Sequence, residues 1–133
     1  MTLNIRVIAP DRTVWDANAE EVILPSSTGQ LGILTGHIPL LTALDIGVMR
    51  VRIDKDWVPI VLMGGFAEID NNKITILVNG AEETIDIDIS LAQKNLEEAT
   101  AKLTQAISTK DKIEATQNIR KARARLQAVV TIN

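Results

Sequence analysis

The chain contains one histidine, His37, at the end of an apolar run in which Gly29, Gly32 and Gly36 recur at short intervals. An imidazole forms a metal site or a catalytic base only beside further ligands or an orienting partner. The sequence places no second His, no Cys and no cluster of Asp and Glu at ligand spacing nearby. We therefore expect no metal site, no catalytic residue and no cofactor here.

The adjacent glycines Gly64 and Gly65 could belong to a phosphate-binding loop. Phosphate-binding loops follow the pattern G-x-G-x-x-G or end in Gly-Lys-Ser/Thr, and neither pattern occurs in this chain. Glycine also permits a close backbone approach that a Cβ would block. The pair therefore favours close strand packing over a phosphate site.

Two pairs of adjacent acids, Glu20-Glu21 and Glu82-Glu83, could serve acid and base chemistry. Neighbouring side chains on a strand point to opposite faces of the sheet, so the carboxylates of one pair would not meet over one substrate. We expect solvated surface at both pairs. With no catalytic constellation elsewhere, the sequence predicts a protein that is not itself an enzyme.

Basic side chains gather near the end of the chain, at Arg120, Lys121, Arg123 and Arg125. On a helix, at about 100° per residue, they spread over the face opposite Ile119, Ala122 and Leu126. Three interpretations are open: a solvated helix face, contact with nucleic acid, and contact with an acidic protein surface. Nucleic acid is disfavoured because the net charge is −3 and no aromatic residue lies among these charges.

Charge is divided unevenly along the chain. Residues 1–84 carry six basic and eleven acidic side chains, whereas residues 85–133 carry eight basic and six acidic ones. The positive excess belongs to the last predicted helix, which favours an acidic partner surface. Cysteine is absent, which excludes disulfides and thiolate metal sites.

Short segments rich in Val and Ile, with alternating apolar and polar residues, fill the first part of the chain. This pattern is typical of an all-β sandwich or barrel. Turn signals such as Asp54-Lys55-Asp56 and Asp70-Asn71-Asn72 separate the segments. The predicted strands cover residues 3–7, 21–25, 30–34, 48–53, 58–63, 66–70 and 73–78.

From Asp86 the apolar period changes from two to between three and four, which predicts two helices. Asp88 is placed to cap the first, and Asp111 with Glu114 resembles the start of the second. The first apolar stripe is Ala92, Leu96, Ala99, Leu103 and Ala106, and the second is Ala115, Ile119, Ala122, Leu126 and Val129. Two such stripes bury each other in an antiparallel hairpin, but alanine buries little area. We therefore expect a marginal hairpin that can change partners.

The predicted fold is α+β, with an N-terminal β-sandwich domain at residues 1–84 and a two-helix C-terminal domain at residues 88–131. The opening residues lack the charged and apolar regions of a signal peptide, and no apolar run approaches the roughly 20 residues of a spanning helix. We therefore expect contact with a membrane only through partners.

Three separated segments agree in order and spacing with one known family. They are residues 1–10, the glycine-interrupted run 29–41, and Met63-Gly64-Gly65-Phe66-Ala67. Together with the Ala-rich tail they resemble the epsilon subunit of F-type ATP synthases, in the cyanobacterial and plastid form. The resemblance spans the whole chain. It implies a non-catalytic rotor subunit, peripheral on the stromal or cytoplasmic side of the thylakoid membrane, that couples proton-driven rotation to ATP synthesis.

The resemblance also implies where partners bind. The sandwich would join the gamma subunit to the proteolipid ring, with His37 near the gamma shaft. The loop that would face the ring comprises Ser26, Ser27, Thr28, Gly29, Gln30 and Leu31. The basic face at Arg120, Lys121, Arg123 and Arg125 would meet an acidic segment of the catalytic beta subunits and so inhibit ATP hydrolysis.

A nucleotide-sensing module that binds ATP between hairpin and sandwich is the alternative function. Some bacterial relatives bind ATP between the two C-terminal helices, through a pattern Ile-Asp-x-x-Arg-Ala at the start of the first. This chain has Leu91 at the arginine position of that pattern, whereas Arg125 matches a basic position of those relatives. Leu91 therefore predicts weak or absent ATP binding.

Overall fold

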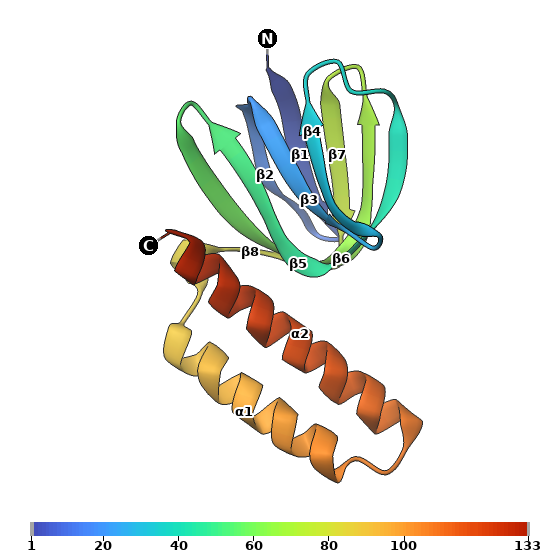
Figure 1. The fold of residues 1–133 in the computed structure, drawn as a ribbon, viewed down its shortest axis with the longest axis vertical. Coiled ribbons are helices and arrows are strands. Elements are labelled where there is room, and N and C mark those ends of the chain that lie inside the picture. The colour runs from blue at the N-terminus through green and yellow to red at the C-terminus, as the bar shows by residue number, and fades with distance from the viewer. Residues whose placement is uncertain (1, 133) are drawn as a thin grey trace.

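The computed structural model describes residues 2–132, so Met1, at the start of the first predicted domain, and Asn133 lie outside the described residues. A β-sandwich is followed by two antiparallel helices, which confirms the predicted α+β fold (Figure 1). The strands are β1 Leu3–Ala9, β2 Arg12–Ala19, β3 Glu21–Ser26, β4 Gly29–Leu34, β5 Leu40–Ile53, β6 Asp56–Asp70, β7 Lys73–Val78 and β8 Ala81–Glu83. The short 3-10 helix η1 Thr84–Asp86 leads to α1 Ile89–Gln105 and α2 Thr109–Ile132.

The strands form one curled sheet in the order β2-β1-β7-β6-β5-β3-β4, with β8 added to β6. Strands β1 and β7 pair in parallel, and the other pairs are antiparallel. Alternate residues point inward, so Leu3, Ile5 and Val7 of β1 are fully buried. The core is built almost entirely from Ile, Leu, Val and Ala, as the near absence of aromatic residues requires.

Strands β5 and β6 are longer than the sequence predicts, because each continues through a bend. Asp45 and Gly64 have no partner in the otherwise continuous register. The inward positions of β6 change there, from Ile60 and Leu62 to Ala67 and Ile69. Gly64 has a φ of 84°, which favours glycine and allows the chain to bend without ending the strand. The predicted separate strands 58–63 and 66–70 are therefore one.

Two observed strands, β2 and β8, were not among the predicted ones. Strand β2 lies at the edge of the sheet, and its last inward positions are only Ala17 and Ala19, beside Asp16 and Asn18, which are residue types that strands disfavour. Strand β8 has three residues and pairs with residues 60–62 of β6. Neither strand carries the apolar pattern that a sequence prediction needs.

Helix α1 begins where the sequence predicts, since the Leu91 amide donates to Asp88 Oδ1 at 3.1 Å. Helix α2 begins earlier than predicted. Ser108 Oγ accepts from the Asp111 amide at 3.1 Å and the Ser108 carbonyl accepts from the Lys112 amide. Ser108 is therefore the N-cap, and Asp111 lies in the first turn, where a negative charge favours the helix dipole.

The two predicted apolar stripes do face each other. Ala92 and Ala99 of α1 and Ala115, Ile119 and Ala122 of α2 are buried, which confirms the antiparallel hairpin. A further pair of buried alanines, Ala124 and Ala128, packs against the sheet. Helix α2 thus lies between α1 and the sandwich (Figure 1).

Candidate functional site

The turn between β3 and β4 forms one end of the sandwich and contains the predicted contact loop. Ser26 is buried, and its Oγ lies 3.1 Å from Thr28 Oγ1 and 3.3 Å from Thr42 Oγ1. Residues 27–30 are exposed, whereas Leu31 packs against the core. The hydroxyl contacts stiffen a small polar turn, so a partner could bind it with little loss of conformational entropy.

His37 lies at the opposite end of β4 from this turn, in the connection to β5 (Figure 1). Six strand residues separate the two regions, which corresponds to about 20 Å. The Gly36 amide donates to Asn72 Oδ1 at 2.7 Å, and this bond ties the connection to the turn between β6 and β7. His37 Nδ1 lies 2.7 Å from the Ile38 carbonyl oxygen. The structure therefore does not bring His37 and the β3–β4 turn into one site.

No group of three or more His, Cys, Asp or Glu side chains that could hold a metal ion occurs among residues 2–132. In the same part of the chain, no helix is long and apolar enough to cross a membrane.

An exposed apolar row crosses the outer face of four strands. The register aligns Ile8 of β1 with Leu77 of β7, Leu77 with Phe66 of β6, and Phe66 with Ala43 of β5. Phe66 is 57% exposed and Leu77 is 53% exposed, although both belong to strands whose alternate residues form the core. A shallow groove lies over this row and also includes Pro10. A contiguous apolar patch on a rigid sheet is typical of a protein-binding surface.

This apolar row was not among the features predicted from the sequence. The sequence does contain a local sign of the row. Phe66 and Leu77 are apolar, yet they stand at outward-facing positions, next to the inward-facing residues Ala67, Ile76 and Val78. Which residues of different strands align, however, depends on the strand order and register, and these follow from long-range pairing.

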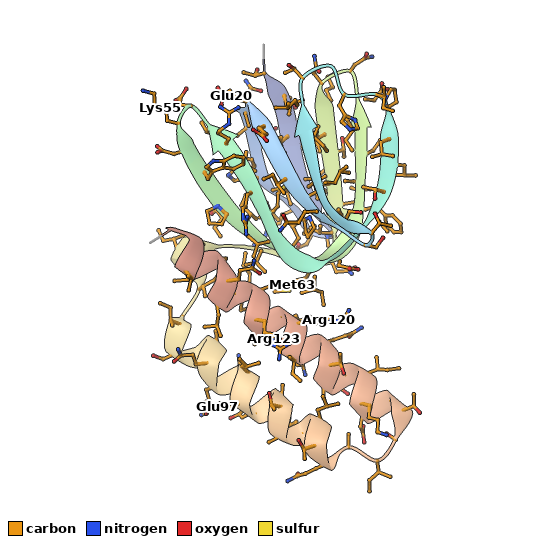
Figure 2. All side chains as sticks on the ribbon, viewed as in Figure 1. Glu20, Lys55, Met63, Glu97, Arg120 and Arg123 are labelled. Atoms are coloured by element: carbon orange, nitrogen blue, oxygen red, sulfur yellow. The ribbon has the colours of Figure 1, made fainter. Side chains whose placement is uncertain are left out.

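The outer face of β5 and β6 beyond the bend is covered by α2. Val48 and Val61 form a buried cluster with Ala124 and Ala128. Met63, labelled in Figure 2 between the sheet and the helix, packs at its edge. At about 0.8 kcal/mol for each methyl-sized group, the two alanines contribute on the order of 2 kcal/mol. Burial of Val48 and Val61 against the helix adds to this contribution.

An ion pair between Arg125 of α2 and Glu82 of β8 supplements the apolar contact. Arg125 Nε lies 2.9 and 3.0 Å from the two carboxylate oxygens, and Nη2 lies 2.8 Å from Oε2. The side chains are 26% and 28% exposed. A bidentate, partly buried pair of this kind contributes roughly 1.5–3 kcal/mol, comparable to the alanine contact.

This geometry corrects two expectations from the sequence. Glu82 is not solvated surface, because its carboxylate is partly buried and accepts hydrogen bonds from Nε and Nη2 of Arg125. Arg125 does not lie on a free solvent face with the other three basic residues, because it is partly buried and pairs with Glu82 of β8. Arg120 and Arg123 are exposed along the middle of α2 (Figure 2), and Lys121 is partly buried beside the groove between the helices.

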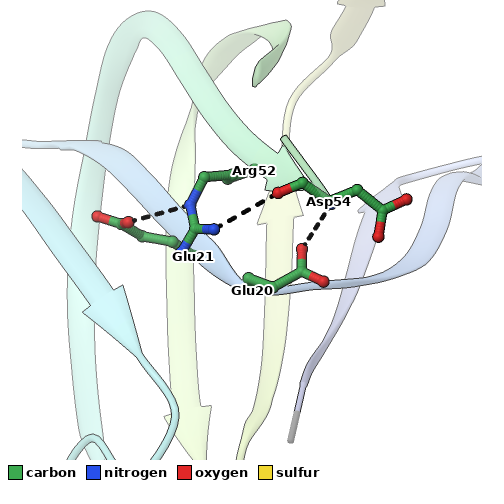
Figure 3. Close-up of polar contacts among 4 residues, drawn as sticks. All are labelled: Glu20, Glu21, Arg52 and Asp54. Carbon is green, nitrogen blue, oxygen red and sulfur yellow. Dashed lines mark hydrogen bonds and ion pairs between the residues drawn. The ribbon is translucent and has the colours of Figure 1, made fainter. Parts of the chain in front are cut away.

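The other acidic pair also has structural partners. Glu20 Oε2 accepts from the Asp54 amide at 2.8 Å, and Glu21 Oε1 pairs with Arg52 Nε at 3.4 Å (Figure 3). Arg52 Nη1 reaches the Asp54 carbonyl at 3.5 Å. These contacts fix the tight turn at Asp54, whose φ is 56°, and they leave the pair no catalytic arrangement.

Comparison with known proteins gives the family. The descriptions "ATP synthase, Delta/Epsilon chain, beta-sandwich domain" and "ATP synthase, Delta/Epsilon chain, long alpha-helix domain" match residues 2–84 and 86–129. The chain belongs to the ATP synthase delta/epsilon family. This membership confirms the resemblance found in the sequence.

Individual relatives agree with this membership. The chloroplastic ATP synthase epsilon chain of Porphyra purpurea is 77% identical over 128 residues, which are 96% of each chain. The ATP synthase epsilon chain of Thermosynechococcus vestitus is 63% identical over 131 residues, which cover 96% of this chain and 95% of that one. A chain of the Euglena gracilis mitochondrial ATP synthase has the same fold, with a TM-score of 0.85 at 22% identity, over 97% of this chain and 81% of that one.

Proposed function

We propose that this chain is the epsilon subunit of a photosynthetic-type F-type ATP synthase and a non-catalytic part of its central stalk. The matches across both domains and the identity to chloroplastic and cyanobacterial epsilon chains support this proposal. The chain would lie at the periphery of the thylakoid membrane, on the stromal or cytoplasmic side, and contact the membrane only through partners.

One observation supports a partner-binding role for the sandwich. It is the exposed apolar row at Ile8, Leu77, Phe66 and Ala43. We assign this row to the gamma subunit, because a rotor must transmit torque through a rigid, extensive contact and the sheet behind the row is fully packed. The turn at residues 26–31 would contact the proteolipid ring from its own end of the sandwich. His37, at the other end of β4, would lie near the gamma shaft outside this row.

Co-purification tests this assignment. The full chain, mixed with isolated gamma subunit, should elute with it as a one-to-one complex. A failure to associate, with both proteins folded by circular dichroism, would argue against the proposal.

The helical hairpin would restrain ATP hydrolysis by presenting basic side chains to an acidic segment of the catalytic beta subunits. Arg120 and Arg123 support this role because both are exposed and no salt bridge to either is found among the described residues. Arg125 could join them only after it leaves Glu82.

Changing Arg120 and Arg123 to Glu should raise ATP hydrolysis by the reconstituted head complex several-fold, because attraction to the acidic segment becomes repulsion. Hydrolysis rates at matched epsilon content measure the effect. The inhibition by the native chain should also weaken as salt rises, since the Debye length is about 8 Å at physiological ionic strength. The matched control is Lys110→Glu, an exposed cation at the start of α2. Unchanged inhibition by the double variant would mean that the two arginines are only solvated surface.

ATP binding is the alternative function, and we expect the isolated chain to bind ATP weakly or not at all. Leu91 cannot supply the charge-assisted contact to phosphate, a loss of about 1.5–3 kcal/mol or one to two decades in affinity. Titration calorimetry checks this, with Leu91→Arg as the variant that should bind more tightly. Low-micromolar binding by the native chain would favour the nucleotide sensor.

A further inference from the structure

The contact between Arg125 and Glu82 joins the two domains beside the small apolar cluster of Val48, Val61, Ala124 and Ala128. Glu82 belongs to β8, and β8 leads directly through η1 into α1. Arg125 belongs to α2, the helix that returns to the sandwich after the hairpin turn. The pair therefore connects the start of the helical domain with its end.

In the described part of the chain, helix α1 has no contact with a strand as extensive as its contact with α2. It packs against α2, on the side of α2 that faces away from the strands (Figure 1). Helix α2 in turn contacts the sheet through Ala124 and Ala128, which pack on Val48 and Val61 with Met63 at the edge of the cluster. Whatever holds α2 in place consequently holds the whole hairpin.

The guanidinium of Arg125 uses two of its nitrogens, Nε and Nη2, for both oxygens of one carboxylate. A bidentate contact of this geometry is the one that Arg makes with a carboxylate or a phosphate. Glu82 therefore occupies the edge of Arg125 that an anionic ligand would otherwise take.

We propose that Glu82 and Arg125 form an internal clasp that keeps the hairpin docked on the sandwich without any bound anion. The Glu82 carboxylate takes the place that a bound anion would have at Arg125. Opening of the hairpin therefore depends on competition for Arg125, and not on whether a nucleotide is bound. This proposal deepens the regulatory role proposed above and rests on it for its biological meaning. The docking of the hairpin by the clasp is a property of the isolated chain.

Hydrogen exchange of the full chain, followed by mass spectrometry, tests the clasp. Glu82→Gln and Arg125→Gln should each speed exchange of the α2 amides about tenfold relative to the β7 amides, which the loss of one charge-assisted contact predicts. The charge exchange Glu82→Arg with Arg125→Glu should restore much of the protection. Glu83→Gln, which removes the neighbouring carboxylate, is the matched control and should change nothing. Millimolar ATP or inorganic phosphate should leave exchange in the native chain unaltered.

Two results would overturn the proposal. One is native protection of α2 in both single variants, which would reduce the pair to an incidental surface contact. The other is slower exchange of α2 in the native chain when ATP or phosphate is added, which would show that a ligand does hold the hairpin. Faster exchange of the β7 amides as well would indicate general unfolding of the single variants. In that case, recovered protection of α2 in the charge-exchanged variant would support the clasp, and no recovery would overturn it. Failure to bind the gamma subunit, by contrast, would affect only the proposed function.

Discussion

Changing both Phe66 and Leu77 to Asp should abolish assembly of the chain with the gamma subunit. Each side chain lies in the middle of the apolar row and is more than half exposed, so the isolated chain should keep its stability. Central apolar residues of an interface each contribute about 2 kcal/mol or more, and two together correspond to roughly a thousandfold loss of affinity. Surface-immobilised gamma subunit provides the affinity measurement.

The matched control for this pair is Ile107→Asp. Ile107 is 92% exposed, but it lies in the turn between the helices, far along the chain from the sheet. This variant should bind the gamma subunit as the native chain does. If the double variant bound equally well, the apolar row would not be the gamma contact.

Replacing Gly65 by Ala should destabilise the sandwich more than any surface change. A Cβ at this position would lie 2.0 Å from the Leu77 carbonyl oxygen, an atom of the neighbouring backbone that cannot move aside. The φ of 156° adds strain for a residue with a side chain. Overpacking and backbone strain together should cost on the order of 4 kcal/mol, a large part of the stability of a small domain. The midpoint of urea unfolding measures the loss.

Gly32→Ala is the control for this substitution. Gly32 also lies in a strand, but nothing stands within 4 Å of a Cβ built there. The free energy of unfolding of the Gly32→Ala variant should differ from that of the native chain by less than about 0.5 kcal/mol. Equal urea midpoints for Gly65→Ala and the native chain would mean that β6 and β7 can separate at the bend, contrary to the packing described.

The sequence predicted the elements whose residues repeat regularly. Alternation placed Leu3, Ile5 and Val7 in the core, and the helical period identified Ala92 and Ala99 as the inner face of α1. The residue type at the start of the helical pattern also predicted Asp88 as the N-cap of α1. These features depend on neighbours within a few residues, so a single sequence contains them.

The remaining features depend on contacts between distant parts of the chain. Glu82 and Arg125 are 43 residues apart, and nothing in the sequence near either one identifies the other. The apolar row requires the parallel pairing of β1 with β7, which no local pattern specifies. The continuity of β6 depends on Gly64, where a glycine that normally ends a strand instead bends it. The candidate site was therefore only partly predictable.

Restoration of proton-driven ATP synthesis tests the central claim most directly. Membranes whose ATP synthase has been depleted of its epsilon subunit should synthesise ATP slowly and hydrolyse it rapidly. Addition of the full chain should restore synthesis and suppress hydrolysis together, whereas the Phe66→Asp, Leu77→Asp variant should do neither. Membranes that remain uncoupled after the native chain has been added at saturating concentration would contradict the assignment of this protein as the coupling subunit of the rotor.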